Sequence, residues 1–248
     1  MYSYIKHCGY FDMVIDLQGL IKSGVITYLL DSKLKIGFDY RSAKEGIASI
    51  FYHKKCHIQY QEHILERNLS LLNLSLDSHF TREDITKNRP FFTPCPLPQE
   101  LKFLEQATES KKVLFVIEAS RASKVYPKEY FVELANMIEG DIFIIYHNDR
   151  DSAHYITTHS KAKLLPRVSL KIARDIISQM DMVIGGDTGI VHLAWGVNSG
   201  SITLFSDTNP DRFCLKTPIN RCLSVKNKGE LLSSITPLEI YELYKEII

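Results

Sequence analysis

The chain has 248 residues, of which 45% are hydrophobic and 24% charged, as in an ordinary globular protein. This composition excludes a disordered chain, a collagen-like repeat and a disulfide-dense miniprotein. Lys and Arg total 30 against 29 Asp and Glu, and a net charge of only +1 argues against nonspecific nucleic-acid binding, so we expect no nucleic-acid partner.

The cysteine pattern and the lack of long apolar runs predict a cytoplasmic protein. Five cysteines occur with no C-x-x-C spacing, which favours free thiols in a reducing compartment over a zinc site or a disulfide framework. No apolar run approaches the ~20 residues that span a bilayer, so we expect no transmembrane segment. The N-terminus shows no secretory signal pattern, and membrane contact is expected only at the surface.

Strand-length apolar runs alternate with helix-period segments in the first third of the chain. The pattern predicts strands at residues 11–17 and 35–38, and helices at residues 20–30, 42–51 and 63–74. Residues 81–98 contain four prolines and no periodic pattern, which predicts a linker.

A second alternating series follows the linker. Strands are predicted at residues 113–117, 142–146, 182–184 and 202–205, and helices at 127–138, 152–159, 169–178 and 188–195. A capping box with proline at the first helical position, Thr236-Pro-Leu-Glu239, starts a closing helix that runs to residue 248. Strand–helix alternation predicts parallel sheets covered by helices, in two units with a cleft between them at the carboxyl ends of the strands.

The strongest local signal spans residues 184–193. A strand ends at Gly185 and Gly186 and a helix begins, so free N–H groups and the helix dipole predict an anion site, with phosphate or pyrophosphate as the guest. The Asp187 carboxylate would repel phosphate, which places it on sugar hydroxyls or on the helix cap; Thr188 is the second candidate cap. The alternative is an ordinary glycine turn with a capped helix.

Two further strand ends carry polar side chains. After the strand at 113–117, Ser120, Ser123 and Lys124 offer hydroxyls and a mobile cation for phosphate, unless this is a solvated loop. After the strand at 142–146, Asp149 and Asp151 suit ribose hydroxyls or a divalent metal, whereas Asp151 could equally cap the next helix.

The first third carries a basic stretch and a polar turn. Arg41, Lys44 and Arg67 would clamp an anionic acceptor if they converge, the alternative being a solvated helix face. Asp16 and Gln18 follow the first predicted strand and either bind a ligand or tie down the loop.

Taken together, five segments resemble the bacterial lipopolysaccharide heptosyltransferases, in the family's order and over most of the chain. Residues 41–45 are similar to the members that add the first heptose. The segments are residues 10–23, 37–45, 63–68, 120–127 and 185–193.

The resemblance implies a GT-B fold of two Rossmann-like halves with a cleft between them. It places a partial acceptor-side domain at residues 1–95 and a nucleotide-sugar-binding domain at 99–235, with the helix at 237–248 packing back on the first half. It implies transfer of L-glycero-D-manno-heptose from ADP-heptose to the Kdo of a lipid A–Kdo acceptor, with inversion and with neither cofactor nor catalytic metal. The implied location is peripheral, on the cytoplasmic face of the inner membrane.

The resemblance also implies roles for individual residues. Lys124 would stabilise the leaving group, and Ser120 with the amides of Thr188 and Gly189 would help to hold the donor phosphates. Asp187 and His192 would face the heptose and Asp149 the ribose, while Arg41, Lys44 and Arg67 would bind the acceptor.

The sequence departs from the family at three places. The family begins with a strand and a Lys-x-Ser-Ser-x-Gly-Asp loop that supplies the catalytic base, and nothing similar precedes Phe11. Residues 204–210 lack the usual Gly-Pro-Thr, and Ala119 stands where threonine is usual. We therefore expect a fragment or miscalled start of a working enzyme, or a remnant that binds ADP-heptose without transferring it. A later-acting heptosyltransferase and an α/β scaffold that binds no sugar nucleotide are also compatible with the sequence.

Overall fold

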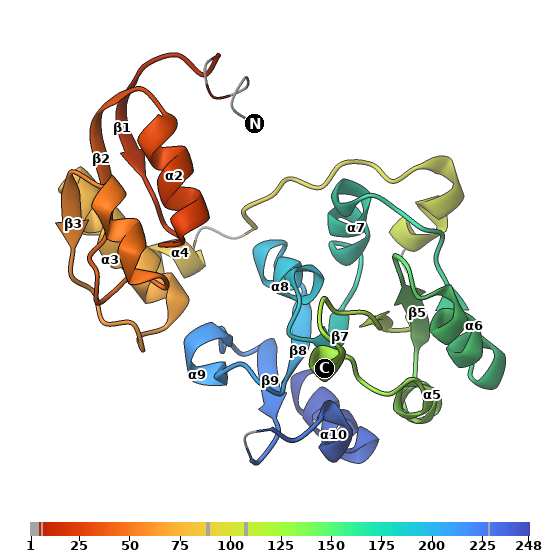
Figure 1. Cartoon of the computed structure of the whole chain (residues 1–248). Helices are drawn as coiled ribbons and strands as arrows, with labels where there is room; N and C mark the ends of the chain where they lie inside the picture. Colours follow the sequence, from red (N-terminus) through yellow and green to blue (C-terminus); the bar gives the residue numbers. More distant parts are fainter. Residues whose placement is uncertain (1–4, 6, 88–89, 107–108, 228) are drawn as a thin grey trace. The chain divides into compact units, whose positions relative to one another are not determined.

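A computed structural model describes residues 5, 7–87, 90–106, 109–227 and 229–248. The chain divides into two compact units, Met1–Lys87 with Asp211–Phe213 and Asn88–Pro210 with Cys214–Ile248. Each unit is built on a parallel β-sheet, which confirms the predicted α/β class (Figure 1). Within the described ranges, no helix is both long and apolar enough to cross a bilayer.

The first unit contains a three-stranded sheet in the order β1-β2-β3. The strands are β1 (Phe11–Ile15), β2 (Ser32–Phe38) and β3 (Lys54–Cys56). Its helical elements are α2 (Ile21–Leu29), the 3₁₀ helix η1 (Gly46–Phe51), α3 (Ile64–Leu76) and α4 (Arg82–Lys87). The strand β3 was not predicted, because its three residues are too few to show a period.

Two predictions for the first unit are corrected. The helix expected at 42–51 is a turn followed by η1, because the Asp39 carboxylate accepts the N–H groups of Arg41 and Ser42 and holds a turn instead. The predicted linker begins with α4, where Thr81 and Asp84 accept each other's backbone N–H groups as a capping box. Residues 88–89, also in the predicted linker, lie outside the described residues.

The second unit contains a six-stranded parallel sheet in the order β6-β5-β4-β7-β8-β9. The strands are β4 (Lys112–Val116), β5 (Asp141–Ile145), β6 (Lys163–Leu164), β7 (Met182–Gly186), β8 (Gly200–Phe205) and β9 (Asn220–Ser224). The sequence did not predict β6, which has two residues, or β9, which is largely polar. The strand order reverses between β4 and β7, which is where ligands bind in doubly wound sheets.

Alternate residues of each central strand supply the two hydrophobic cores of this unit. Val113 and Phe115 of β4 pack in the core that holds α5 (Lys128–Met137), α6 (Arg150–His159) and α10 (Pro237–Ile247). Leu114 and Val116 pack in the other, with α7 (Leu170–Ile177) and α8 (Gly189–Gly196). Because successive side chains point to opposite faces of a strand, both faces of this sheet are apolar, and helices cover both of them.

The closing helix contributes to the core of the second unit. α10 packs against α5 and β8, with Ile240 and Tyr244 buried in that core, and its packing on the first half, which the resemblance implied, stays a prediction. Its capping box is formed as predicted, since Thr236 and Glu239 accept each other's backbone N–H groups. The apolar face of α10 is long enough to complete the core over α5.

The cysteines also differ from expectation. Cys214 and Cys222 are joined as a disulfide, although the odd cysteine count predicted free thiols. The turn before β9 brings their Cα atoms to 6.4 Å, within the range that a disulfide spans. The sequence separation of eight residues gave no sign of this proximity.

Gly186 allows the loops after β4 and β7 to touch. A Cβ atom at Gly186 would overlap the carbonyl oxygen of Lys124, a backbone atom that cannot swing away, whereas a Cβ at Gly189 would meet nothing within 4 Å. We expect Gly186→Ala to lower the free energy of unfolding by ~1–3 kcal/mol, as overpacking does. Gly189→Ala is the matched control, and urea denaturation followed by circular dichroism compares them. Equal midpoints for the two variants would contradict the close approach.

Candidate functional site

The loops that follow β4 and β7 leave the sheet at the same edge. Val116 is in register with Gly185 across the parallel pair, so both strands end at the same level. One loop continues into the short 3₁₀ helix η3 (Ala122–Lys124), and the other into the N-terminus of α8. The two strongest sequence signals therefore meet at the point where the strand order reverses.

Lys124, Asp187 and His192 form one polar cluster at this edge. Lys124 Nζ lies 2.5 Å from Asp187 Oδ2, and His192 Nε2 lies 2.8 Å from Asp187 Oδ1. The Lys124 and Asp187 side chains are 16% and 9% exposed, and that of His192 is 41% exposed. The cation expected to hold phosphate is thus paired with a carboxylate.

Asp187 is a strong acid in this setting. Burial alone would raise the pKa of its carboxyl, but hydrogen bonds from His192 and Lys124 and the charge of Lys124 outweigh burial and lower the pKa to about 2. Asp187 is therefore ionised at neutral pH. Because a carboxylate only accepts hydrogen bonds, Nε2 of His192 carries the proton in this pair.

The N-terminus of α8 carries an unused donor. Thr188 is the N-cap residue, yet its side chain makes no capping bond, and its buried Oγ1 has no hydrogen-bond partner among the residues that the structure describes. The capping role that the sequence allowed for Asp187 or Thr188 is therefore not formed. An unpartnered buried hydroxyl beside free helical N–H groups and the open space over Gly189 fits an anionic ligand.

A second loop contact fixes the ends of β4 and β5. The Glu118 carboxylate accepts backbone N–H groups from His147, Asn148 and Asp149 at 2.6–3.1 Å. The sequence analysis gave Glu118 no role; its place directly after a buried strand was the signal available. Three donors on one carboxylate hold the loop after β5 rigid beside the loop after β4.

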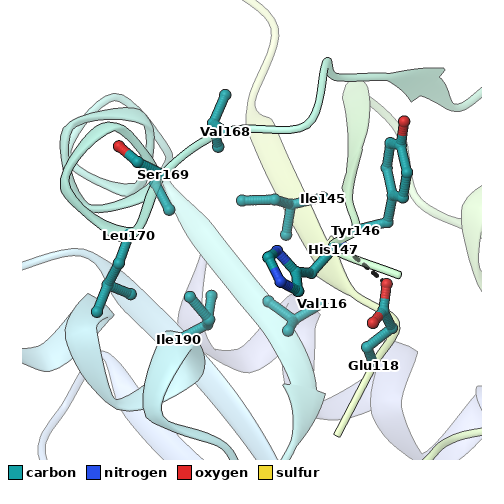
Figure 2. Close-up of a pocket in the computed structure, with 10 residues that line it drawn as sticks. Val116, Glu118, Ile145, Tyr146, His147, Val168, Ser169, Leu170 and Ile190 are labelled. Atoms are coloured by element: carbon teal, nitrogen blue, oxygen red, sulfur yellow. Dashed lines mark hydrogen bonds between the residues drawn. The ribbon is translucent and has the colours of Figure 1, made fainter. Parts of the chain in front are cut away.

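A cavity of about 350 Å³ opens between these strand ends and α7 and α8 (Figure 2). Apolar side chains supply most of its wall, and Glu118, His147 and Ser169 supply polar groups. Its apolar lining consists of Val116, Ile145, Val168, Leu170, Ala173 and Ile190, with Tyr146 at its border. Arg167 lies 3.1 Å from His147 Nε2 at the rim. Sequence reasoning missed this cavity, because its wall comes from four elements distant in the chain.

Three predicted donor residues are not part of the hydrogen-bonded cluster of Lys124, Asp187 and His192. Asp149 caps α6 by accepting the Ser152 N–H at 3.0 Å, so this residue, rather than Asp151, is the cap. Ser120 is exposed in the loop after β4. Gly189 is exposed at the first turn of α8. Among the described residues, no group of three or more His, Cys, Asp or Glu could hold a metal ion.

The predicted acceptor residues differ in exposure. Arg41 and Lys44 are exposed, whereas Arg67 is only 3% exposed and donates from Nη2 to the Ser42 carbonyl at 2.5 Å. Through this hydrogen bond, Arg67 stabilises the turn that carries Arg41 and Lys44. None of these three cations forms an ion pair within the described chain.

Asp16 ties down its own loop. Its Oδ1 accepts from the backbone of Gln18 at 2.8 Å, and its Oδ2 accepts from Ser23 at 2.7 Å and from Tyr52 at 2.6 Å. Burial and the Asp16 charge raise the pKa of Tyr52. Of the two roles considered for Asp16, the geometry shows the structural one.

The chain is similar to known heptosyltransferases over nearly its whole length. It is 31% identical over 261 residues to lipopolysaccharide heptosyltransferase 1 of Campylobacter coli, covering 96% of this chain and 76% of that protein. It is 27% identical over 208 residues to the Escherichia coli K12 protein of the same name, of which it spans 62% of the length.

Solved structures agree in fold. Escherichia coli heptosyltransferase WaaC with ADP-2-deoxy-2-fluoro heptose superposes with a TM-score of 0.73 and 26% identity, over 95% of this chain and 72% of that one. Escherichia coli ADP-heptose heptosyltransferase II, at 16% identity and a TM-score of 0.66, supports the fold alone.

A family model described as glycosyltransferase family 9 (heptosyltransferase) matches residues 5–233. This match covers both units and both loops of the site. The chain therefore belongs to glycosyltransferase family 9, a family of heptosyltransferases that share this parallel α/β GT-B architecture.

Proposed function

We propose that this chain binds ADP-heptose in its second unit and transfers the heptose to the Kdo of a lipid A–Kdo acceptor. The observation that carries the proposal is the pairing of Lys124 with Asp187, next to the unpartnered hydroxyl of Thr188, at the strand-order reversal and beside an apolar cavity. This combination suits a ligand with a flat apolar ring system and two negative groups. The WaaC structures with ADP and with an ADP-heptose analogue support the choice of ligand.

The donor would lie along the carboxyl edge of the sheet. The nucleoside would enter the cavity between β4, β5 and α7, with its ribose near the loop that Glu118 and Asp149 organise. The diphosphate would lie over the N-terminus of α8, near Ser120 and the amides of Thr188 and Gly189. Lys124 would then contact phosphate, and Asp187 with His192 would face the sugar hydroxyls.

The chemistry follows from these positions. The anomeric C–O bond to phosphate breaks as the acceptor hydroxyl attacks from the opposite face, which inverts the anomeric carbon. Lys124 and the α8 N-terminus stabilise the charge that develops on the leaving diphosphate without a metal ion. A base must take the hydroxyl proton, and the family motif that supplies it has no counterpart in this sequence.

The acceptor would meet the first unit. Arg41 and Lys44 are exposed cations on a turn that Arg67 supports, which suits the negative groups of a lipid A–Kdo molecule. We propose that the chain acts as a peripheral protein at the cytoplasmic face of the inner membrane, where such an acceptor would be presented.

Calorimetry with ADP, together with a transfer assay, tests the proposal. The assay supplies ADP-heptose with either lipid A–Kdo or the same acceptor already carrying one heptose. Product on the first acceptor supports the proposal, and product only on the second identifies a later-acting enzyme. ADP binding without product identifies a donor-binding remnant, and absence of ADP binding rejects the function altogether.

Replacing Lys124 tests the donor site directly. We expect Lys124→Ala to weaken ADP binding at least tenfold, on the scale of a lost charge-assisted hydrogen bond, and to lower any turnover by ~10²-fold. Lys163→Ala, which removes an exposed lysine paired with Asp141, is the control and should bind ADP normally. A loss below threefold for Lys124→Ala would remove Lys124 from the proposed site.

The acidity of Asp187 predicts how stability depends on pH. Its pKa is about 2 in the folded chain against 3.8 ordinarily, so ionised Asp187 stabilises the fold above pH 4. This contribution, about 2 kcal/mol, disappears as the pH falls through 2. The free energy of unfolding, measured by urea denaturation, should fall less between pH 6 and pH 2 for Asp187→Asn than for the native chain. Glu242→Gln, an exposed carboxylate on α10, should retain the native profile; identical curves for Asp187→Asn and the native chain would refute the assignment.

A further inference from the structure

Two arginines of the first unit share one aromatic ring. Arg67 lies on α3, and Arg212 lies on the short helix α9 (Pro210–Phe213), whose residues 211–213 belong to the first unit. Their guanidinium carbons lie 4.9 Å and 4.0 Å from the centre of the Tyr60 ring. The two residues are only 3% and 9% exposed.

Neither arginine has an anionic partner among the described residues. Neither forms an ion pair in that part of the chain, and the Nε atom of each is buried without a hydrogen-bond partner there. Burial and the positive charge of Arg212 lower the pKa of Arg67, while Tyr60 and Glu62 act in the opposite direction. Two buried like charges that form no ion pair destabilise each other, and an oxyanion bound between them would offset that repulsion.

The stacking contacts do not use the Nε–H group of either arginine. Arg67 also lies over Phe38, at 4.5 Å, and Arg212 over Phe213, at 5.1 Å, so aromatic rings interact with the two guanidinium groups. Arg67 uses Nη2 for the Ser42 carbonyl, which leaves its Nε unpaired. A guanidinium edge presents parallel N–H groups that match the two oxygens of a carboxylate or phosphate.

We propose that Arg67 and Arg212, stacked on Tyr60, form a binding site for an oxyanion of the acceptor, either a carboxylate or a phosphate. The identification of the anion with the acceptor rests on the proposed function; the need for an anion rests on the arginine pair itself. Arg212 is the new member of the acceptor side, because of these two arginines the sequence indicated only Arg67. Arg67 also holds Ser42, so the anion would lie next to the turn that carries Arg41 and Lys44.

Calorimetry with free Kdo, which carries a carboxylate, and with inorganic phosphate distinguishes the two sources of the anion. We expect the native chain to bind one of the two probes and Arg212→Met to weaken that binding at least tenfold. Arg212→Lys keeps the charge but loses the planar guanidinium group, so its affinity for the probe should lie between those of the native chain and Arg212→Met. Arg82→Met, which removes a partly exposed arginine of α4 that is paired with Glu66, is the matched control and should bind as the native chain does.

Two further measurements separate this site from a structural role and from the donor site. Without either probe, the midpoint of thermal unfolding should be no lower for Arg212→Met than for the native chain, because the substitution removes an unpaired buried charge. The probe should raise the midpoint of the native chain but not that of Arg212→Met. ADP binding should be the same in all variants. If Arg67→Met fails to fold, the Arg212 variants decide.

Failure of both probes to bind the native chain, or unchanged binding in Arg212→Met, would overturn the oxyanion site while leaving the donor proposal standing. A chain that binds Kdo or phosphate through Arg212 but does not bind ADP would keep the site and remove the proposed function. Binding of phosphate with no binding of Kdo would assign the site to a phosphate group of the acceptor.

Discussion

The ion pair between Lys124 and Asp187 joins the two loops of the proposed donor site. Each residue follows a different strand, and the pair forms because β4 and β7 are neighbours although about 70 residues of sequence separate them. A largely buried cation and anion stabilise each other only while both loops keep their positions. The Thr188 hydroxyl, the open N-terminus of α8 and the position of His192 all depend on that geometry.

Local patterns predicted the second unit well and its long-range contacts poorly. A buried apolar run such as Lys112–Val116 indicates a strand, and the glycines that end β7 indicate a turn, so these elements could be predicted from the sequence. The hydrogen bonds from the loop after β5 to the Glu118 carboxylate form only because two strands become neighbours, and no local sequence pattern predicts that. The placement of α10 and the pairing of Cys214 with Cys222 belong to the same class of tertiary facts.

Charge patterns in the first unit indicated cations but not their environment. Arg41, Lys44 and Arg67 looked equivalent in sequence, yet only Arg67 is buried, where it stacks on aromatic rings and supports the turn that carries the other two. The same holds for Asp16, whose four hydrogen bonds identify a structural carboxylate only once Ser23 and Tyr52 are seen beside it. Exposure decides between the two roles of a charged side chain, and exposure is a property of the fold.

The strand order of the second unit has a consequence for biosynthesis. β4 leaves the ribosome before its partner β7, which follows only after α5, β5, α6, β6 and α7 have been made. Closing so long a stretch of chain delays the central strand pairing, and with it the assembly of every group around Lys124. The edge of β4 that pairs with β7 therefore stays open in the nascent chain until β7 has been made, and an open apolar edge is a place where a chaperone can bind.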